Sequence, residues 1–98
     1  MRIIDASDTI AAASTSQEAL DSTKGIALLT FQNVDSAADI YINFGDVASN
    51  GSGSLLYKPG EGNTWYRPFI PRGPINVFST TMGAEFTLKV GITNALNN

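Results

Sequence analysis

The strict alternation over Asp39–Phe44 constrains the fold of this chain more than any other feature. Ile40, Ile42 and Phe44 fall on one face of an extended backbone, and the residues between them fall on the other. This period of two is typical of a half-buried β-strand, whereas a helix needs apolar residues three and four apart. Gly45 follows with turn chemistry, so the strand is predicted to end there.

Other extended runs are separated by turn residues in the same way. Further strands are predicted over 24–33, 55–57, 64–70, 74–80 and 86–90. Both faces of the 24–33 run are apolar, which is typical of a central strand or of one covered twice. The prolines in and after the 64–70 run cannot donate to a ladder, so that strand is predicted at a sheet edge or at a bulge. Because only a short polar segment separates 24–33 from 39–44, these two runs are predicted to pair as a hairpin.

The spacing of these runs indicates an all-β fold, a small antiparallel β-sandwich or barrel of six to eight short strands. Residues 1–23 are less regular. Thr15 and Glu18 form a capping-box pattern, but the helix that they would open is too short to stand alone. We therefore expect an extended N-terminal arm or edge strand over 1–23 and a single β domain over 24–98. A second interpretation is an arm that becomes ordered only against a neighbouring subunit or a larger assembly.

The 98 residues include no histidine and no cysteine. Disulfides, thiolate nucleophiles, imidazole bases and zinc sites built on histidine or cysteine are thereby excluded. An enzyme is not expected, because the usual nucleophile–base pairs lack their members. No cofactor is expected either. The lack of cysteine fits synthesis in a reducing cytosol.

The charge pattern argues against nucleic acid as a partner. The net charge is −3, and the six Lys and Arg residues are spread along the chain instead of forming a basic patch. No apolar run approaches the roughly 20 residues that span a bilayer, so no membrane association is expected. The first residues lack the apolar core of a signal peptide, and a secretory leader is not predicted.

The carboxylates fit turns better than they fit a catalytic or metal site. Asp35 and Asp39 flank a turn, and Glu61 and Glu85 lie in or beside turns. A glycosidase needs two carboxylates that face each other across a cleft, which a sandwich of this size hardly provides. Asp46 adds another candidate oxygen ligand, but the spacing matches no calcium loop. Local turn capping explains each acidic residue, and neither catalytic nor metal-binding residues are predicted.

Aromatic and arginine residues are the better candidates for binding. Trp65 is predicted to anchor the core, and Tyr66 then points to the opposite face of its strand. Tyr57, Tyr66, Arg67 and Arg72 are the predicted interface residues, because aromatic and arginine side chains dominate interface energetics. Exposed aromatic rings on a β face also stack on sugars.

Four short motifs follow one another between residues 29 and 75. Residues 29–33 read Leu-Thr-Phe-Gln-Asn, 39–45 read Asp-Ile-Tyr-Ile-Asn-Phe-Gly, 56–61 read Leu-Tyr-Lys-Pro-Gly-Glu and 70–75 read Ile-Pro-Arg-Gly-Pro-Ile. From Gly25 to Gly91 this order resembles a segment that recurs in small tailed-bacteriophage virion proteins. The resemblance implies a capsid decoration (cement) protein or another head-associated protein on a compact β-sandwich or barrel, often oligomeric. Residues 1–24 lie outside it.

The function expected on this basis is that of a non-enzymatic structural protein of the virion, made in the host cytoplasm. It would bind the outside of the assembled head as a trimer or dimer, with the major capsid protein or another virion protein as its partner. Binding only the assembled form of the shell would stabilise that form. The alternatives are a carbohydrate-binding β module and a tail or head–tail connector component.

Overall fold

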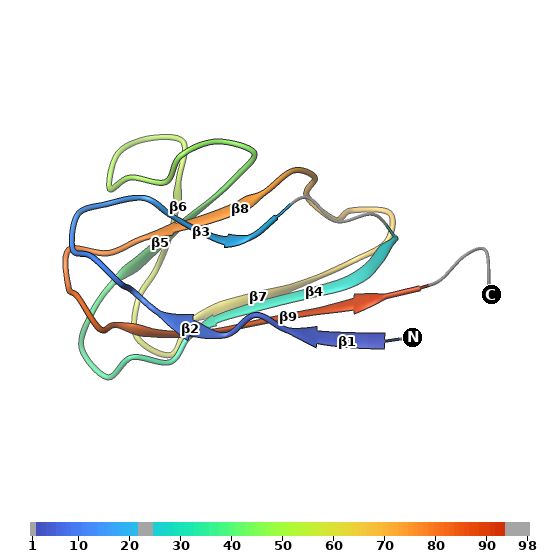
Figure 1. Cartoon of the computed structure of the whole chain (residues 1–98), viewed down its shortest axis with the longest axis horizontal. Coiled ribbons are helices and arrows are strands. Elements are labelled where there is room, and N and C mark those ends of the chain that lie inside the picture. The colour runs from blue at the N-terminus through green and yellow to red at the C-terminus, as the bar shows by residue number, and fades with distance from the viewer. Residues whose placement is uncertain (1, 22–24, 94–98) are drawn as a thin grey trace.

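The computed structural model describes residues 2–21 and 25–93, which form nine β-strands in two layers and no helix (Figure 1). The strands are β1 (Arg2–Asp5), β2 (Asp8–Thr9), β3 (Gln17–Leu20), β4 (Ile26–Asn33), β5 (Ile40–Phe44), β6 (Leu55–Tyr57), β7 (Gly62–Tyr66), β8 (Ile75–Phe78) and β9 (Glu85–Ile92). The predicted all-β fold is confirmed as a sandwich, with nine strands among the described residues where six to eight were predicted.

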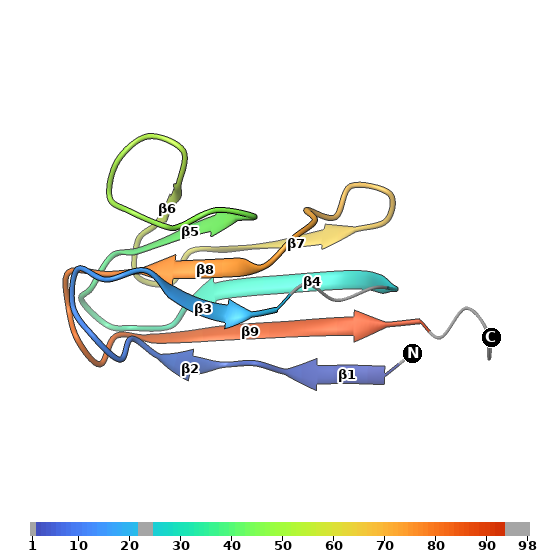
Figure 2. The same cartoon turned by 45° about the horizontal axis from the view of Figure 1, so that its top comes forward.

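Each layer is one antiparallel sheet. The first, here called the β4 sheet, has the order β1-β9-β4-β7, with β2 also paired to β9. The second, the β5 sheet, has the order β3-β8-β5-β6. Figure 2 shows β1 and β2 running end to end along β9, so these two act as one interrupted edge strand.

Strands pair from the two ends of the chain inward. The first position (β1 and β2) pairs with the last strand, β9, and β3 pairs with β8. Further in, β4 pairs with β7, and β5 pairs with β6. A long antiparallel ribbon rolled up in this way is the jelly-roll topology, in which nearly every connection crosses from one sheet to the other.

The predicted hairpin between 24–33 and 39–44 is wrong. β4 lies between β9 and β7 in one sheet, while β5 lies between β8 and β6 in the other. The connection between them is an arch, and Asn33 holds it. Its buried side-chain Nδ2 donates to the carbonyl oxygens of Ala38 and Tyr57, both at 2.8 Å, and its Oδ1 accepts the Asp35 N–H at 2.9 Å. These bonds turn the chain into the opposite sheet instead of back along β4.

Two other strand predictions are confirmed in their positions. β4, which is apolar on both faces, is central in its sheet, and β7 is an edge strand. The predicted extent of 64–70 is wrong, because β7 ends at Tyr66, before Pro68, which cannot donate to a ladder. Residues 2–21 supply the edge strands β1, β2 and β3. Their path crosses from the β4 sheet to the β5 sheet, and the predicted capping-box segment at Thr15–Glu18 leads into β3 instead of a helix.

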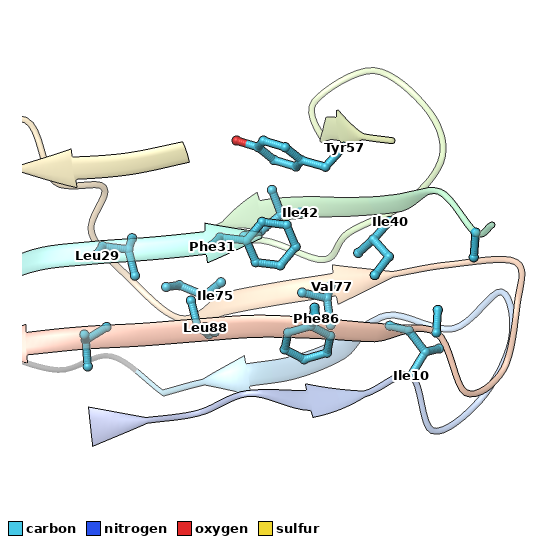
Figure 3. Packing of buried hydrophobic residues seen from close by; sticks show 13 residues of the cluster. Ile10, Leu29, Phe31, Ile40, Ile42, Tyr57, Ile75, Val77, Phe86 and Leu88 are labelled. Atoms are coloured by element: carbon cyan, nitrogen blue, oxygen red, sulfur yellow. The ribbon is translucent and has the colours of Figure 1, made fainter. Parts of the chain in front are cut away.

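The core lies between the two sheets (Figure 3). Its largest fully buried apolar side chains are Phe31, Phe86, Ile10, Leu29, Ile40, Ile42, Ile75, Leu88, Val77 and Val90. All but Ile10, which follows β2, come from the two sheets at alternate strand positions, which is the periodicity that the sequence displays. Rings stack within this layer, with the Phe31 centroid 5.1 Å from Tyr57 and 5.9 Å from Phe86.

The long loop between β5 and β6 rises beside the β5 sheet at the top of Figure 1. Side chains of the sheet hold its first half, because Asn43 Nδ2 donates to Val47 O at 2.9 Å and Asn76 Nδ2 donates to Asp46 O. Ala48, which is buried, donates its backbone N–H to Ser16 Oγ at 2.9 Å. The loop is therefore fastened before it reaches the glycine-rich stretch that follows.

Candidate interaction surface

A row of apolar side chains crosses the outer face of the β4 sheet. Strand register sets Ile3 opposite Gly91, Gly91 opposite Leu28, and Leu28 opposite Tyr66. Because the strand neighbours of these residues face the core, the row faces outward. Ile3 is 54% exposed and Tyr66 64% exposed. The row therefore carries exposed apolar area at both of its ends.

Phe69 follows Tyr66 in the chain, in the loop between β7 and β8. Its backbone N–H donates to Tyr66 O at 2.8 Å, which turns the chain tightly after the end of β7. The Phe69 side chain is 79% exposed, the highest value among the large apolar residues of the described chain. We call Ile3, Leu28, Tyr66 and Phe69 together the Tyr66 surface.

The base of this loop is fixed to the sandwich. Ile70 packs against the core, and Gly45 N donates to Pro74 O at 2.7 Å. Gly73 adopts a φ of 90°, and a Cβ at this position would lie 3.0 Å from Gly45 Cα. Glycine is therefore required where the two loops meet. With its base held, the loop presents Phe69 to solvent.

The two predicted arginines differ in their roles. Arg67 Nε donates to Ile26 O at 3.1 Å and its Nη2 donates to Thr93 Oγ1 at 2.9 Å. Arg67 thus ties the start of β4 to the end of β9. Arg72 is exposed and makes no hydrogen bond or ion pair with any residue in the described ranges, so its guanidinium is available to a partner.

Tyr57 belongs to the core and offers no outer surface. Its side chain is 5% exposed, and its ring packs against Phe31. The hydroxyl donates to Asn63 Oδ1 at 2.8 Å, which links β6 of one sheet to β7 of the other. Burial raises the pKa of the Tyr57 phenol above its ordinary value. Its role is to hold the two sheets together at the edge that β6 and β7 share.

Trp65 lies where the sequence places it. It is half-buried, packs against the core and stands edge-on to Phe44, with ring centroids 5.4 Å apart and planes at 80°. Its neighbour Tyr66 points to the opposite face, as strand geometry requires.

The carboxylates act as local turn caps. Asp35 accepts the backbone N–H groups of Ala37 and Ala38, and the bond from Ala38 contributes most to holding the Asp35 pKa below its ordinary value of 3.8. Glu61 Oε1 accepts the Lys58 N–H at 2.8 Å. Among the described residues no three acidic side chains gather into a group that could hold a metal ion. Asp35 and Glu61 thus stabilise the turns in which they lie.

Sequence reasoning missed Ile3, Leu28 and Phe69. The sequence pattern does place Leu28 on the outer face of its strand, because the buried Leu29 and Phe31 lie on the opposite face. The row itself needs the register of four strands, which no local pattern contains. Phe69 sits between two prolines, and that spacing was a signal for an exposed aromatic residue outside any ladder.

Comparisons with known proteins add no relative: no family model, no curated protein and no solved structure matches this chain. Within the described residues there is no helix long and apolar enough to cross a membrane.

Proposed function

We propose that this chain is a non-enzymatic structural protein of a tailed-phage virion, a decoration protein that binds the outside of the assembled head through the Tyr66 surface. The jelly roll supports this proposal as a fold shared by viral capsid domains. Lectin domains and cupins share it as well, so the topology does not distinguish these functions and the exposed surface has to.

The observation that carries the proposal is the exposure of Tyr66 and Phe69 at one end of the sandwich. Large aromatic side chains that stay exposed, together with the exposed Arg72 three residues after Phe69 in the chain, have the composition of interface hot spots. Their loop is anchored at its base, so little chain entropy is lost on binding. A ligand that binds only the assembled shell stabilises that shell by mass action.

The proposal includes self-association as a dimer or trimer on the shell, with the major capsid protein as the main partner. Repeated copies on a symmetric lattice bind with an effective concentration that a single copy lacks, so a modest surface on each copy suffices. Low charge, at 15% of residues, leaves the surface without a strong field to oppose close packing of copies.

A carbohydrate-binding module is the second candidate, and one feature favours it. Tyr66 shares its face with Thr64, whose hydroxyl lies 3.1 Å from the Thr30 hydroxyl. Beside this pair is a shallow open depression, lined in part by Gln32 and Gly62. An aromatic ring next to a row of hydroxyls suits a sugar, which stacks one face and hydrogen-bonds its edges.

Co-sedimentation with purified shells of the phage that encodes this chain tests the proposal, with unassembled capsid protein as the comparison. We expect saturable binding to shells alone. Phe69→Ser and Tyr66→Ser are each expected to weaken it by about 2 kcal/mol, roughly 30-fold in Kd. Met82→Ser is the matched control, because Met82 is 69% exposed but lies in the turn between β8 and β9, outside the Tyr66 surface.

Equal loss of binding in all three variants would refute the Tyr66 surface, and no binding by the wild-type protein would refute the decoration role. A glycan that quenches Trp65 fluorescence, with a monomer in light scattering and no shell binding, would support the carbohydrate module instead. Intact folding of each variant is checked by urea unfolding, which the exposed substitutions leave within ~0.5 kcal/mol.

A further inference from the structure

The tip of the β5–β6 loop carries the Asn50-Gly51 pair, and no other asparagine in the chain precedes a glycine. Asn50 is exposed and lies in a bend outside the strands. The structure gives its side-chain amide no hydrogen bond to any described residue. The Asn50 amide therefore lacks the bonds to described residues that hold the first half of its loop.

The other described asparagines are held. Asn33 is fully buried with three side-chain bonds, and the amides of Asn43 and Asn76 donate to the backbone of the loop. Asn63 accepts the hydroxyl of Tyr57. A side chain held in this way cannot rotate its Cγ toward the next backbone nitrogen without losing those bonds.

We propose that Asn50 is a site of spontaneous deamidation. Water or hydroxide removes the proton of the Gly51 backbone nitrogen, and this nitrogen attacks the Asn50 side-chain carbonyl carbon. A C–N bond forms, the bond from that carbon to the amide nitrogen breaks, and this nitrogen takes one proton from water and leaves as ammonia. The resulting cyclic imide takes up one water at either carbonyl and opens to aspartate or isoaspartate. No electron is transferred, and water is the only co-reactant.

The local geometry leaves the Gly51 nitrogen within reach of solvent. Its N–H donates to the Ser49 hydroxyl at 3.2 Å, the long end of the hydrogen-bond range, and it takes part in no strand ladder. Glycine has no Cβ to obstruct the approach of the Asn50 side chain. The reaction therefore meets neither a strong backbone bond nor a steric barrier.

Gly51 is not needed for the shape of the loop. Its φ lies outside the left-handed region, and an added Cβ would meet only Ser49 Oγ, at an ordinary 3.6 Å. Gly53 differs, because its φ of 100° requires glycine. Gly51→Ala therefore changes the chemistry of position 51 while keeping the fold, which makes it the right variant for the test.

The full chain is incubated in warm, mildly alkaline buffer, with a mildly acidic buffer as the slow reference. Ion exchange separates the products, and peptide mapping by mass spectrometry locates them. We expect a species one unit more negative than the starting charge of −3, modified at position 50 as aspartate and isoaspartate. Gly51→Ala is expected to slow its formation roughly tenfold, which is ~1.4 kcal/mol in the barrier. Asn50→Gln abolishes it.

An equal rate in Gly51→Ala would overturn the proposal, as would a modified peptide that lacks position 50, including one from residues 94–98. So would an unchanged charge after the incubation. Trp65 fluorescence and the urea midpoint confirm that both variants are folded, and the aged wild-type protein is expected to keep its midpoint. The test does not depend on the function proposed above, because it uses the isolated chain.

Discussion

Replacement of Asn33 by alanine tests how the two sheets are joined. Asn33 is fully buried, and its amide bonds two carbonyl oxygens and one N–H, which belong to the β4–β5 connection and to the end of β6. The variant leaves all three groups without their partner in a space too small to hydrate them freely. At ~1 kcal/mol for each lost bond, and more where the group stays dry, the cost is about 3 kcal/mol or more. The free energy of unfolding of a domain of this size is roughly 5–15 kcal/mol in total.

Urea unfolding followed by Trp65 fluorescence measures this loss, because Trp65 packs half-buried against Phe44 and reports on the core. We expect a lower midpoint with an unchanged slope, since the slope reflects the surface exposed on unfolding. Asn43→Ala is the control, because Asn43 is only half-buried and its side chain makes two bonds, from Nδ2 to Val47 O and from the Phe44 N–H to Oδ1. It should cost about 1–2 kcal/mol, less than Asn33→Ala, because the groups it leaves can reach water.

Asn33→Asp sharpens the test because it keeps the shape and changes the charge. A carboxylate at this position faces the carbonyl oxygens of Ala38 and Tyr57, which repel it, so its pKa in the folded protein is raised. The folded state then binds more protons than the unfolded state, and stability rises as the pH falls. A cost for Asn33→Ala below ~1 kcal/mol, or no recovery of Asn33→Asp in acid, would refute the role of Asn33 as the tie of the arch.

Three further changes probe other parts of the sandwich. Gly62→Ala places a Cβ against the carbonyl oxygen of Phe31 in central strand β4, and urea unfolding should show a loss of ~1–3 kcal/mol. Tyr57→Phe removes the bond to Asn63 between the sheets and should cost ~1 kcal/mol in the same assay. Asp35 has a pKa below 3.8 in the folded protein, so its stabilisation is present above that value and is lost as the pH falls through the folded pKa. Asp35→Asn should therefore lose less stability than the wild type when urea midpoints are compared between neutral and acidic pH.

Local patterns predicted the strands well. The alternation of Ile40, Ile42 and Phe44 reports which side chains face an apolar layer, and the structure places a strand there with its first two alternating residues fully buried. The prolines after Trp65 lack the backbone N–H that a central strand would donate, and β7 is indeed an edge strand. These predictions succeed because each depends on neighbours in the chain only.

The same patterns could not distinguish a hairpin from an arch. In both arrangements the apolar residues of 24–33 and 39–44 face a common core, so the alternation is identical. Asn33 makes the difference, because its side chain bonds both the β4–β5 connection, at Asp35 and Ala38, and the end of β6, at Tyr57. A buried asparagine at the end of a strand reads in the sequence as an ordinary turn residue.

The Tyr66 surface shows how a charged residue two positions along the same strand sets the exposure of an apolar residue. Ile3 and Ile4 are equivalent in the sequence, and a shift of one residue in β1 would exchange their faces. The observed register places Asp5 opposite Lys89 on the outer face, where Asp5 Oδ1 also accepts the Ser7 N–H at 3.0 Å. The shifted register would turn this carboxylate into the core at a cost of several kcal/mol. Asp5 must therefore face solvent, and because Ile3 shares its face, Ile3 is exposed with it.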